Sequence, residues 1–181
     1  MMFSCLRCGA CCKDLIVDFN GWRIGLFLMA HEIGLFPINL VSPGWAVGTR
    51  GRSRPRLNVK SYQLNVKDCP YITPKNLCGI YERRPVICRG HPLTIHVNPA
   101  TMNIRSASVD SKCPKCKEMP FGGGTLQVLG KCFSEDILRA NGAMASYLKW
   151  MFKETAQQVW LYDVNLRQWR EVTAEIVQQW R

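Results

Sequence analysis

The stretch CLRCGACC (residues 5–12) places four cysteines within eight residues, and the last two are adjacent. In a helix, Cys8 would share a face with both Cys11 and Cys12, whereas in a strand or loop the adjacent pair would point apart. The pair therefore favours two metal centres side by side, or one centre with more than one metal atom, over a single-ion knuckle.

Six further cysteines follow in two groups. They are Cys69, Cys78 and Cys88, and then Cys113, Cys116 and Cys132, of which Cys113 and Cys116 form the pair CPKC. A C-x2-C spacing lets both sulfurs reach one ion while backbone amides stabilise the thiolates. Structural zinc takes four ligands per ion, and a 4Fe–4S cluster takes four cysteines. Spacing alone does not choose between zinc and iron.

Ten cysteines in 181 residues would indicate disulfides if the chain were secreted. We find no segment with the charged start, apolar core and small-residue site of a signal peptide. The best apolar run, residues 24–36, is shorter than the ~18–20 residues that span a bilayer. We therefore expect a soluble, cytoplasmic, metal-binding protein without a transmembrane segment. Disulfides, which occur inside hyperthermophiles, and unliganded thiols are the alternatives.

The chain is strongly basic, with 24 Lys and Arg against 13 Asp and Glu and a formal net charge of +11. Eight thiolates and two divalent ions would lower this charge only to about +7. Such an excess favours an anionic partner, RNA or an acidic protein. A Gly/Pro/Ser-rich loop carries alternating arginines that could follow phosphates in a salt-dependent way, with ordinary solvation as the equal alternative: Arg50, Arg52, Arg54 and Arg56.

Hydrophobic periodicity and turn residues predict the local structure. We expect a helix from Asn20 to Leu35, a strand or hairpin arm at 57–66, a pair of strands at 93–97 and 102–109, and a long helix from Ser134 towards Trp160. The tail after that helix predicts a strand, a turn and a short terminal helix.

These elements predict an α+β fold, a small cysteine-rich metal-binding domain with few regular strands and a helical C-terminal part. We expect the cysteine-cluster domain to cover residues 1–120. Residues 121–181 would form a helical extension packed on it.

The motifs CGACC (residues 8–12), CPY (residues 69–71) and CGIYERRPVICR (residues 78–89), in this order, resemble the CxxCxxCC family of zinc- or iron-chelating proteins. This family is also called the YkgJ-like cysteine-cluster proteins and is often labelled as containing an Fe–S cluster. The resemblance covers roughly residues 1–120, and it is specific because the IY-x-x-R-P-x-x-C-R block is rare.

The resemblance implies eight cysteine ligands and leads us to prefer an iron–sulfur cluster to Zn²⁺. The implied ligands are Cys5, Cys8, Cys11, Cys12, Cys69, Cys78, Cys88 and one of Cys113 or Cys116. Cys132 lies outside the pattern and is interpreted as a buried apolar thiol.

The residues around Cys88 carry further chemistry. Arg84 and Arg89 would partly neutralise the thiolate charge, and Tyr81 can pack its ring over the site and offer its hydroxyl to a sulfur. We interpret these three as cofactor-binding residues, with a loop-holding salt bridge as the equal alternative for Arg84. His91 could add a ligand, but the cysteines suffice without it. His31 and His96 are interpreted as ordinary histidines.

The sequence therefore predicts a metal-binding protein with a redox or structural role. One alternative is a basic RNA- or ribosome-associated protein with a structural zinc core. The other is a component of a protein-modifying enzyme, because a related cysteine cluster occurs in enzymes that methylate flagellin lysines. The sequence has no strand-borne GxGxG loop and no CxxxCxxC spacing, and it identifies no catalytic residue. Enzymatic activity and oligomeric state are left open.

Overall fold

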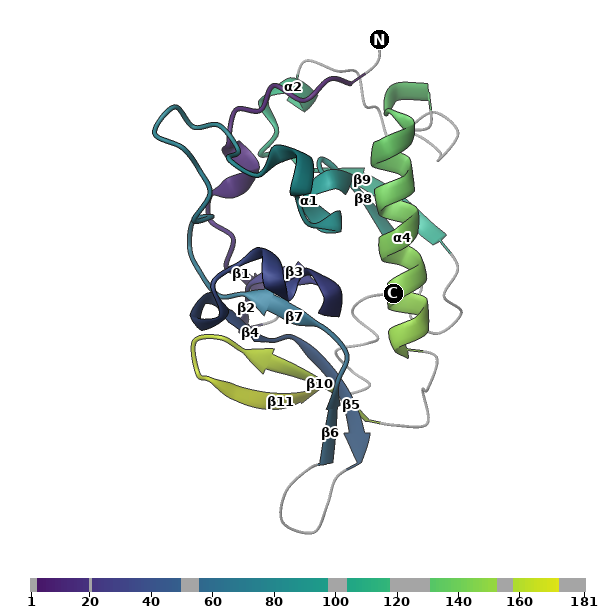
Figure 1. Cartoon of the computed structure of the whole chain (residues 1–181). Coiled ribbons are helices and arrows are strands. Elements are labelled where there is room, and N and C mark those ends of the chain that lie inside the picture. The colour runs from purple at the N-terminus through teal and green to yellow at the C-terminus, as the bar shows by residue number, and fades with distance from the viewer. Residues whose placement is uncertain are drawn as a thin grey trace. The chain divides into compact units, whose positions relative to one another are not determined.

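The chain folds into two compact units, each built from two separate segments (Figure 1). The computed structural model describes residues 3–19, 21–49, 56–97, 104–117, 131–152 and 158–172. The cysteine unit comprises residues 1–13 and 68–149, and the sheet unit comprises residues 14–67 and 150–181. All ten cysteines belong to the cysteine unit.

The described residues of the sheet unit form three antiparallel sheets. The first pairs β1 (Val17–Phe19) with β2 (Trp22–Ile24). The second has the order β3 (Leu26–Leu28), β7 (Tyr62–Leu64), β4 (Val41–Pro43). The third has the order β11 (Gln168–Val172), β10 (Gln158–Asp163), β5 (Trp45–Thr49), β6 (Arg56–Val59). The 3₁₀ helices η2 (Ala30–Leu35) and η3 (Ile38–Leu40) connect β3 to β4.

A buried glutamine joins the three-stranded sheet to the four-stranded sheet. The Gln63 side chain is 2% exposed, and its Nε2 donates to the carbonyl oxygens of Pro43 (2.7 Å) and Tyr162 (2.8 Å). Its Oε1 accepts the amide hydrogen of Gly25 (2.7 Å). One side chain therefore satisfies backbone groups from β4, from β10 and from the residue before β3.

The cysteine unit contains one long helix, α4 (Glu135–Phe152), which belongs to this unit as far as Lys149, and several shorter elements. The others are η1 (Ala10–Cys12), η4 (Tyr81–Arg83), α1 (Val86–Gly90), α2 (Pro114–Lys117) and the antiparallel pair β8 (Leu93–Val97) and β9 (Ile104–Val109). Buried Asn141 of α4 donates its Nδ2 to the carbonyl of Gly90 (2.9 Å), which ties α4 to α1.

The predicted fold class is wrong. The described residues hold eleven strands in four sheets, and α4 is the only helix among them that exceeds six residues. Residues 158–172, which the predicted fold class assigns to a helical C-terminal part, form the β10–β11 hairpin. The reason is that β10 pairs with β5 on one side and β11 on the other, so tertiary pairing determines its conformation. The strand expected directly after the long helix is confirmed as β10. The predicted domain boundary at residue 120 lies outside the described residues and stays a prediction.

Some of the predicted helices and strands are confirmed, and others are wrong. The strand pair predicted at 93–97 and 102–109 is confirmed as β8 and, from residue 104, as β9, and a helix does begin after Ser134. The predicted helix from Asn20 to Leu35 is wrong, because residues 22–28 form β2 and β3. A Cβ on Gly25 would collide with the carbonyl oxygen of Leu64, so the glycine permits the close approach of the chain to β7.

Because Gln63 joins two sheets, we expect its removal to lower the stability of the folded chain strongly. Gln63→Leu would leave one buried amide hydrogen and two carbonyl oxygens without their partner, and we expect it to lower the free energy of unfolding by about 2–4 kcal/mol. Chemical denaturation monitored by tryptophan fluorescence measures this change. The matched control is Gln168→Leu at an exposed position of β11, and an equal effect of both variants would contradict the assigned role.

Candidate metal centre

The first cysteine segment turns sharply before η1. Arg7 and Gly9 have left-handed backbone conformations, with φ of 53° and 69°. A Cβ on Gly9 would collide with the carbonyl oxygen of Asn76 and lie 3.0 Å from Cδ1 of Ile72. Glycine is therefore required twice at this position, for its backbone angle and for the contact with the second cysteine segment.

The second cysteine segment folds back on itself. The amide of Gly79 donates to the carbonyl of Tyr71 (2.8 Å), and the amide of Thr73 donates to the carbonyl of Leu77 (2.9 Å). This hairpin-like loop returns the chain from Cys69 to Cys78. A further backbone hydrogen bond, from the amide of Cys69 to the carbonyl of Cys12 (2.8 Å), joins the loop to η1.

The structure brings together thiols from three segments, which we call the first thiol group: Cys11, Cys12, Cys69, Cys78 and Cys88. The Cys12 thiol hydrogen-bonds to the sulfurs of both Cys11 and Cys69. Cys88 lies close enough to Cys11, Cys69 and Cys78 for their charges to act on it. The adjacent cysteines of CLRCGACC thus belong to one group.

The hydrogen bonds of Cys12 shift the pKa values of three thiols in this group in opposite directions. Accepting the Cys12 hydrogen bond lowers the pKa of Cys11 to about 7 and the pKa of Cys69 to about 7. The hydrogen bonds with Cys11 and Cys69 raise the pKa of Cys12, and burial raises the pKa of Cys88. Cys11 and Cys69 are consequently the thiols that ionise most readily, and the thiolate is the form that binds metal.

Two arginines stack on Tyr81 beside these thiols. The guanidinium carbons of Arg7 and Arg84 lie 3.9 Å and 3.6 Å from the centre of the Tyr81 ring. Two guanidinium groups this close must occupy opposite faces of the ring. Arg84 also donates its Nε to the carbonyl of Tyr81 (2.8 Å). Its fixed positive charge favours the thiolates of Cys11 and Cys88.

The second thiol group consists of Cys5, Cys113, Cys116 and Cys132. Cys113 and Cys116 are buried in an apolar cluster, and the other two pack against that cluster. Burial raises the pKa of Cys116 to about 12, with a contribution from its hydrogen bond to Cys113. The amide of Phe3 donates to the carbonyl of Cys132 (2.7 Å), which fixes the N-terminal segment beside this group.

Sequence reasoning gave no role to Asp110. Its carboxylate lies 3.7 Å from Nδ1 of His91, and its charge acts on Cys11 in the first group and on Cys116 in the second. No motif surrounds it, and its only signal was its position between β9 and CPKC. Cys132 was also assigned no ligand role, although it packs with the second group.

The remaining residues named from the sequence occupy different surroundings, and three of them lie outside the described residues. Cys8 is exposed, and the side chain of Arg89 lines a cavity. Arg56 is exposed at the start of β6 in the sheet unit. The other three arginines of the predicted RNA-binding loop lie outside the described residues: Arg50, Arg52 and Arg54.

The chemistry of the thiols suits a metal. Within the described residues, no three Cys, His, Asp or Glu side chains are arranged to hold an ion. The first thiol group nevertheless supplies five soft sulfur donors, and two of them have a pKa of about 7. The charge of Arg84 also favours the thiolate form. Thiolates are the preferred ligands of structural zinc and of iron–sulfur clusters. The donor set therefore fits zinc or iron.

The contact at Gly9 predicts that this residue docks the first cysteine segment. Gly9→Ala would strain the backbone and displace Asn76, and we expect it to lower the free energy of unfolding by about 1–3 kcal/mol. Gly34→Ala is the control, because a Cβ there meets open space; it should change stability by less than about 0.5 kcal/mol. Denaturant titration of both variants measures the difference, and equal stabilities would refute the docking role.

Comparison with known proteins agrees with the chemistry of these residues. The model of the CxxCxxCC family, described as a "putative zinc- or iron-chelating domain", matches residues 4–117. No curated protein and no solved structure matches the chain. Among the described residues, no helix has both the length and the apolar character needed to cross a membrane. With more than half of its length matched, the chain belongs to the CxxCxxCC family of zinc- or iron-chelating domains.

Proposed function

We propose that the cysteine unit holds a polynuclear metal centre, an iron–sulfur cluster in preference to two zinc ions, with a redox or structural role. The observation that supports this proposal best is the convergence of the first thiol group from three segments, with Cys12 hydrogen-bonded to Cys11 and Cys69. The family description names zinc and iron without deciding between them.

The number of thiols favours more than one metal atom. A structural zinc ion takes four ligands, and the first thiol group alone contains five sulfurs. The adjacent Cys11 and Cys12 both belong to this group, so a single tetrahedral ion would leave one sulfur unused. Cys5, Cys8 and the two thiols of CPKC extend the donor set to the nine cysteines named from the sequence.

The residues around the thiols would control their charge and position. Cys11 and Cys69 would bind as thiolates most readily, because the Cys12 hydrogen bond already lowers their pKa. Arg84 would offset the negative charge of the thiolates, and the stack on Tyr81 would hold that guanidinium in place. A bound iron–sulfur cluster would supply one-electron redox chemistry, whereas zinc would supply structural stability alone.

The two alternative functions stay predictions. RNA or ribosome association rests on the basic loop, three of whose four arginines lie outside the described residues. Participation in a protein-modifying, lysine-methylation-like reaction rests on the related cysteine cluster of flagellin methylases. No contact among the described residues favours either function.

Metal analysis of anaerobically purified protein tests the proposal directly. We expect iron and acid-labile sulfide at about four of each per cluster, with absorption near ~400 nm that dithionite bleaches. Elemental analysis and absorption spectroscopy measure these quantities. A colourless protein with about two zinc ions per chain would refute the cluster and retain the metal centre. A chain with neither metal would overturn the proposal.

A matched pair of cysteine variants tests the composition of the centre. Cys12→Ala would remove the thiol that connects Cys11 to Cys69, and we expect loss of most of the metal. Cys132→Ala removes a thiol outside the family match and should retain the metal. Metal content per folded chain, with folding checked by circular dichroism, compares the two. Full metal content in Cys12→Ala would show that Cys12 is not a ligand.

A further inference from the structure

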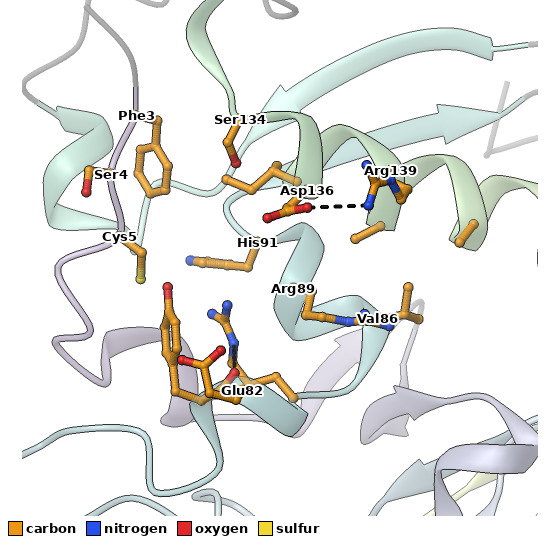
Figure 2. Close-up of a pocket in the computed structure, with 15 residues that line it drawn as sticks. Phe3, Ser4, Cys5, Glu82, Val86, Arg89, His91, Ser134, Asp136 and Arg139 are labelled. Atoms are coloured by element: carbon orange, nitrogen blue, oxygen red, sulfur yellow. Dashed lines mark hydrogen bonds and ion pairs between the residues drawn. The ribbon is translucent and has the colours of Figure 1, made fainter.

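A cavity of about 590 Å³ lies within the cysteine unit (Figure 2). Its walls come from the N-terminal segment, from η4 and α1, and from the first turns of α4. Its volume falls within the range of about 300–1,000 Å³ that small-molecule sites occupy. The cavity is therefore large enough for a metabolite-sized ligand.

The charges that line the cavity do not balance. Two carboxylates contribute to the wall, and each has an arginine nearby: Glu82 lies 3.9 Å from Arg7, and Asp136 lies 3.6 Å from Arg139, which also pairs with Glu135 at 2.9 Å. Arg84 and Arg89 also line the cavity, and neither has a carboxylate partner in the described part of the chain. The wall thus presents two guanidinium groups that no carboxylate of the described residues pairs with, and the charge of Arg84 also acts on Cys11 and Cys88.

Several polar groups of the wall are held in place by other contacts. Arg84 is fixed by its stack on Tyr81 and by its Nε hydrogen bond, which leaves its terminal nitrogens as donors. His91 is 19% exposed, and its Nδ1 lies 3.7 Å from the carboxylate of Asp110. Figure 2 shows the His91 ring reaching into the cavity towards Cys5. A ligand would meet groups whose orientation is already set, which lowers the entropic cost of binding.

Another part of the wall is apolar. Phe3 and Ile137 are buried in the same apolar cluster as Phe133, and Ala140 continues this surface along α4. The ring centres of Phe3 and Phe133 lie 5.4 Å apart, so the aromatic wall is itself supported from behind. The cavity therefore combines a cationic part with a hydrophobic part, as sites for small organic ligands do.

We propose that this cavity binds a small organic anion, with a phosphate or carboxylate head held by Arg84 and Arg89 and an apolar body against Phe3 and Ile137. Guanidinium groups bind both kinds of head through paired, charge-assisted hydrogen bonds. Cys5 and Arg84 belong both to this cavity and to the surroundings of the proposed metal centre. Metal content is therefore measured on the same samples, so that a failure of anion binding is distinguished from a failure of the metal centre.

Calorimetric titration of the full chain with three probes tests the proposal. Phenyl phosphate and phenylacetate share an aromatic body and differ in the head, and inorganic phosphate has the head alone. We expect one aromatic probe to bind with a Kd below ~1 mM and at least about tenfold more tightly than inorganic phosphate. The better aromatic probe identifies the head group. Absence of binding by all three probes at about 10 mM would overturn the proposal.

A first pair of variants separates the cavity from general charge. Arg89→Gln removes a guanidinium that lines the cavity, and we expect it to weaken binding of the better probe by about tenfold or more. Arg83→Gln removes an equal charge from an exposed neighbour outside the wall and should leave the affinity unchanged. Equal losses in both variants would show non-specific attraction and refute the site.

A second pair, on α4, tests the site without removing an arginine. Ala143 lines the cavity and is exposed on the helix, so Ala143→Glu should fold normally, place a carboxylate in the cavity and abolish binding. Ser146→Glu adds the same charge less than one turn farther along, at a position outside the wall. We expect it to bind as the unaltered chain does. Unchanged affinity in Ala143→Glu would overturn the proposal, and metal content measured on the same samples separates it from the metal centre.

Discussion

The contact between Cys12 and Cys69 determines how the rest of the cysteine unit is assembled. The backbone hydrogen bond between these residues joins η1 to the second cysteine loop, and their side chains hydrogen-bond as well. The chain leaves the cysteine unit after residue 13 and returns at residue 68, so this contact lies where the long segment 14–67 begins and ends. A metal bound at both cysteines would close that segment as a loop, and cross-links that close long loops remove much entropy from the unfolded chain.

Thiolates that lie close together repel one another, and a nearby cationic side chain reduces this repulsion. Thiolates at Cys11 and Cys69 repel one another and raise the pKa of buried Cys88. Arg84 acts in the opposite direction on Cys11 and Cys88, and its stack on Tyr81 keeps it close without a carboxylate partner among the described residues. An arginine paired with a carboxylate would neutralise the thiolates less effectively. The aromatic ring thus positions a charge without cancelling it.

The sequence predicted the chemistry of the site better than the fold. Every member of the first thiol group was named as a ligand through the resemblance to the CxxCxxCC family, because each belongs to a short, local motif of that family, and their role as ligands stays a prediction. Asp110 could not be found in this way, since its importance comes from contacts with residues far away in the chain. Cys132 packs against the apolar cluster that contains Cys113 and Cys116, a neighbourhood that only the folded chain creates.

The strands were missed for two physical reasons. The three-residue strands β2 and β3 are too short to show an alternating pattern, whereas the longer β8 and β9, and the segment 57–66 that contains β7, alternate clearly enough to be predicted. In addition, Ile24, Phe27 and Leu28 have the spacing of one helix face. Only the tertiary approach of Gly25 to the Leu64 carbonyl, which no local pattern encodes, requires the extended chain.

The family match covers only part of the residues that line the cavity, so the cavity draws on a matched segment and on a segment beyond the match. The match ends at residue 117, and it includes all the thiols of the first group together with Arg84 and Arg89. The first turns of α4, which supply Ile137, Ala140 and Ala143 to the cavity, lie beyond it. Changes in this helix would alter the shape of the cavity and the ligand body that it accepts, while the thiols and the arginines stayed as they are. The metal chemistry would then belong to the matched segment, and the choice of organic anion to the helix that follows it.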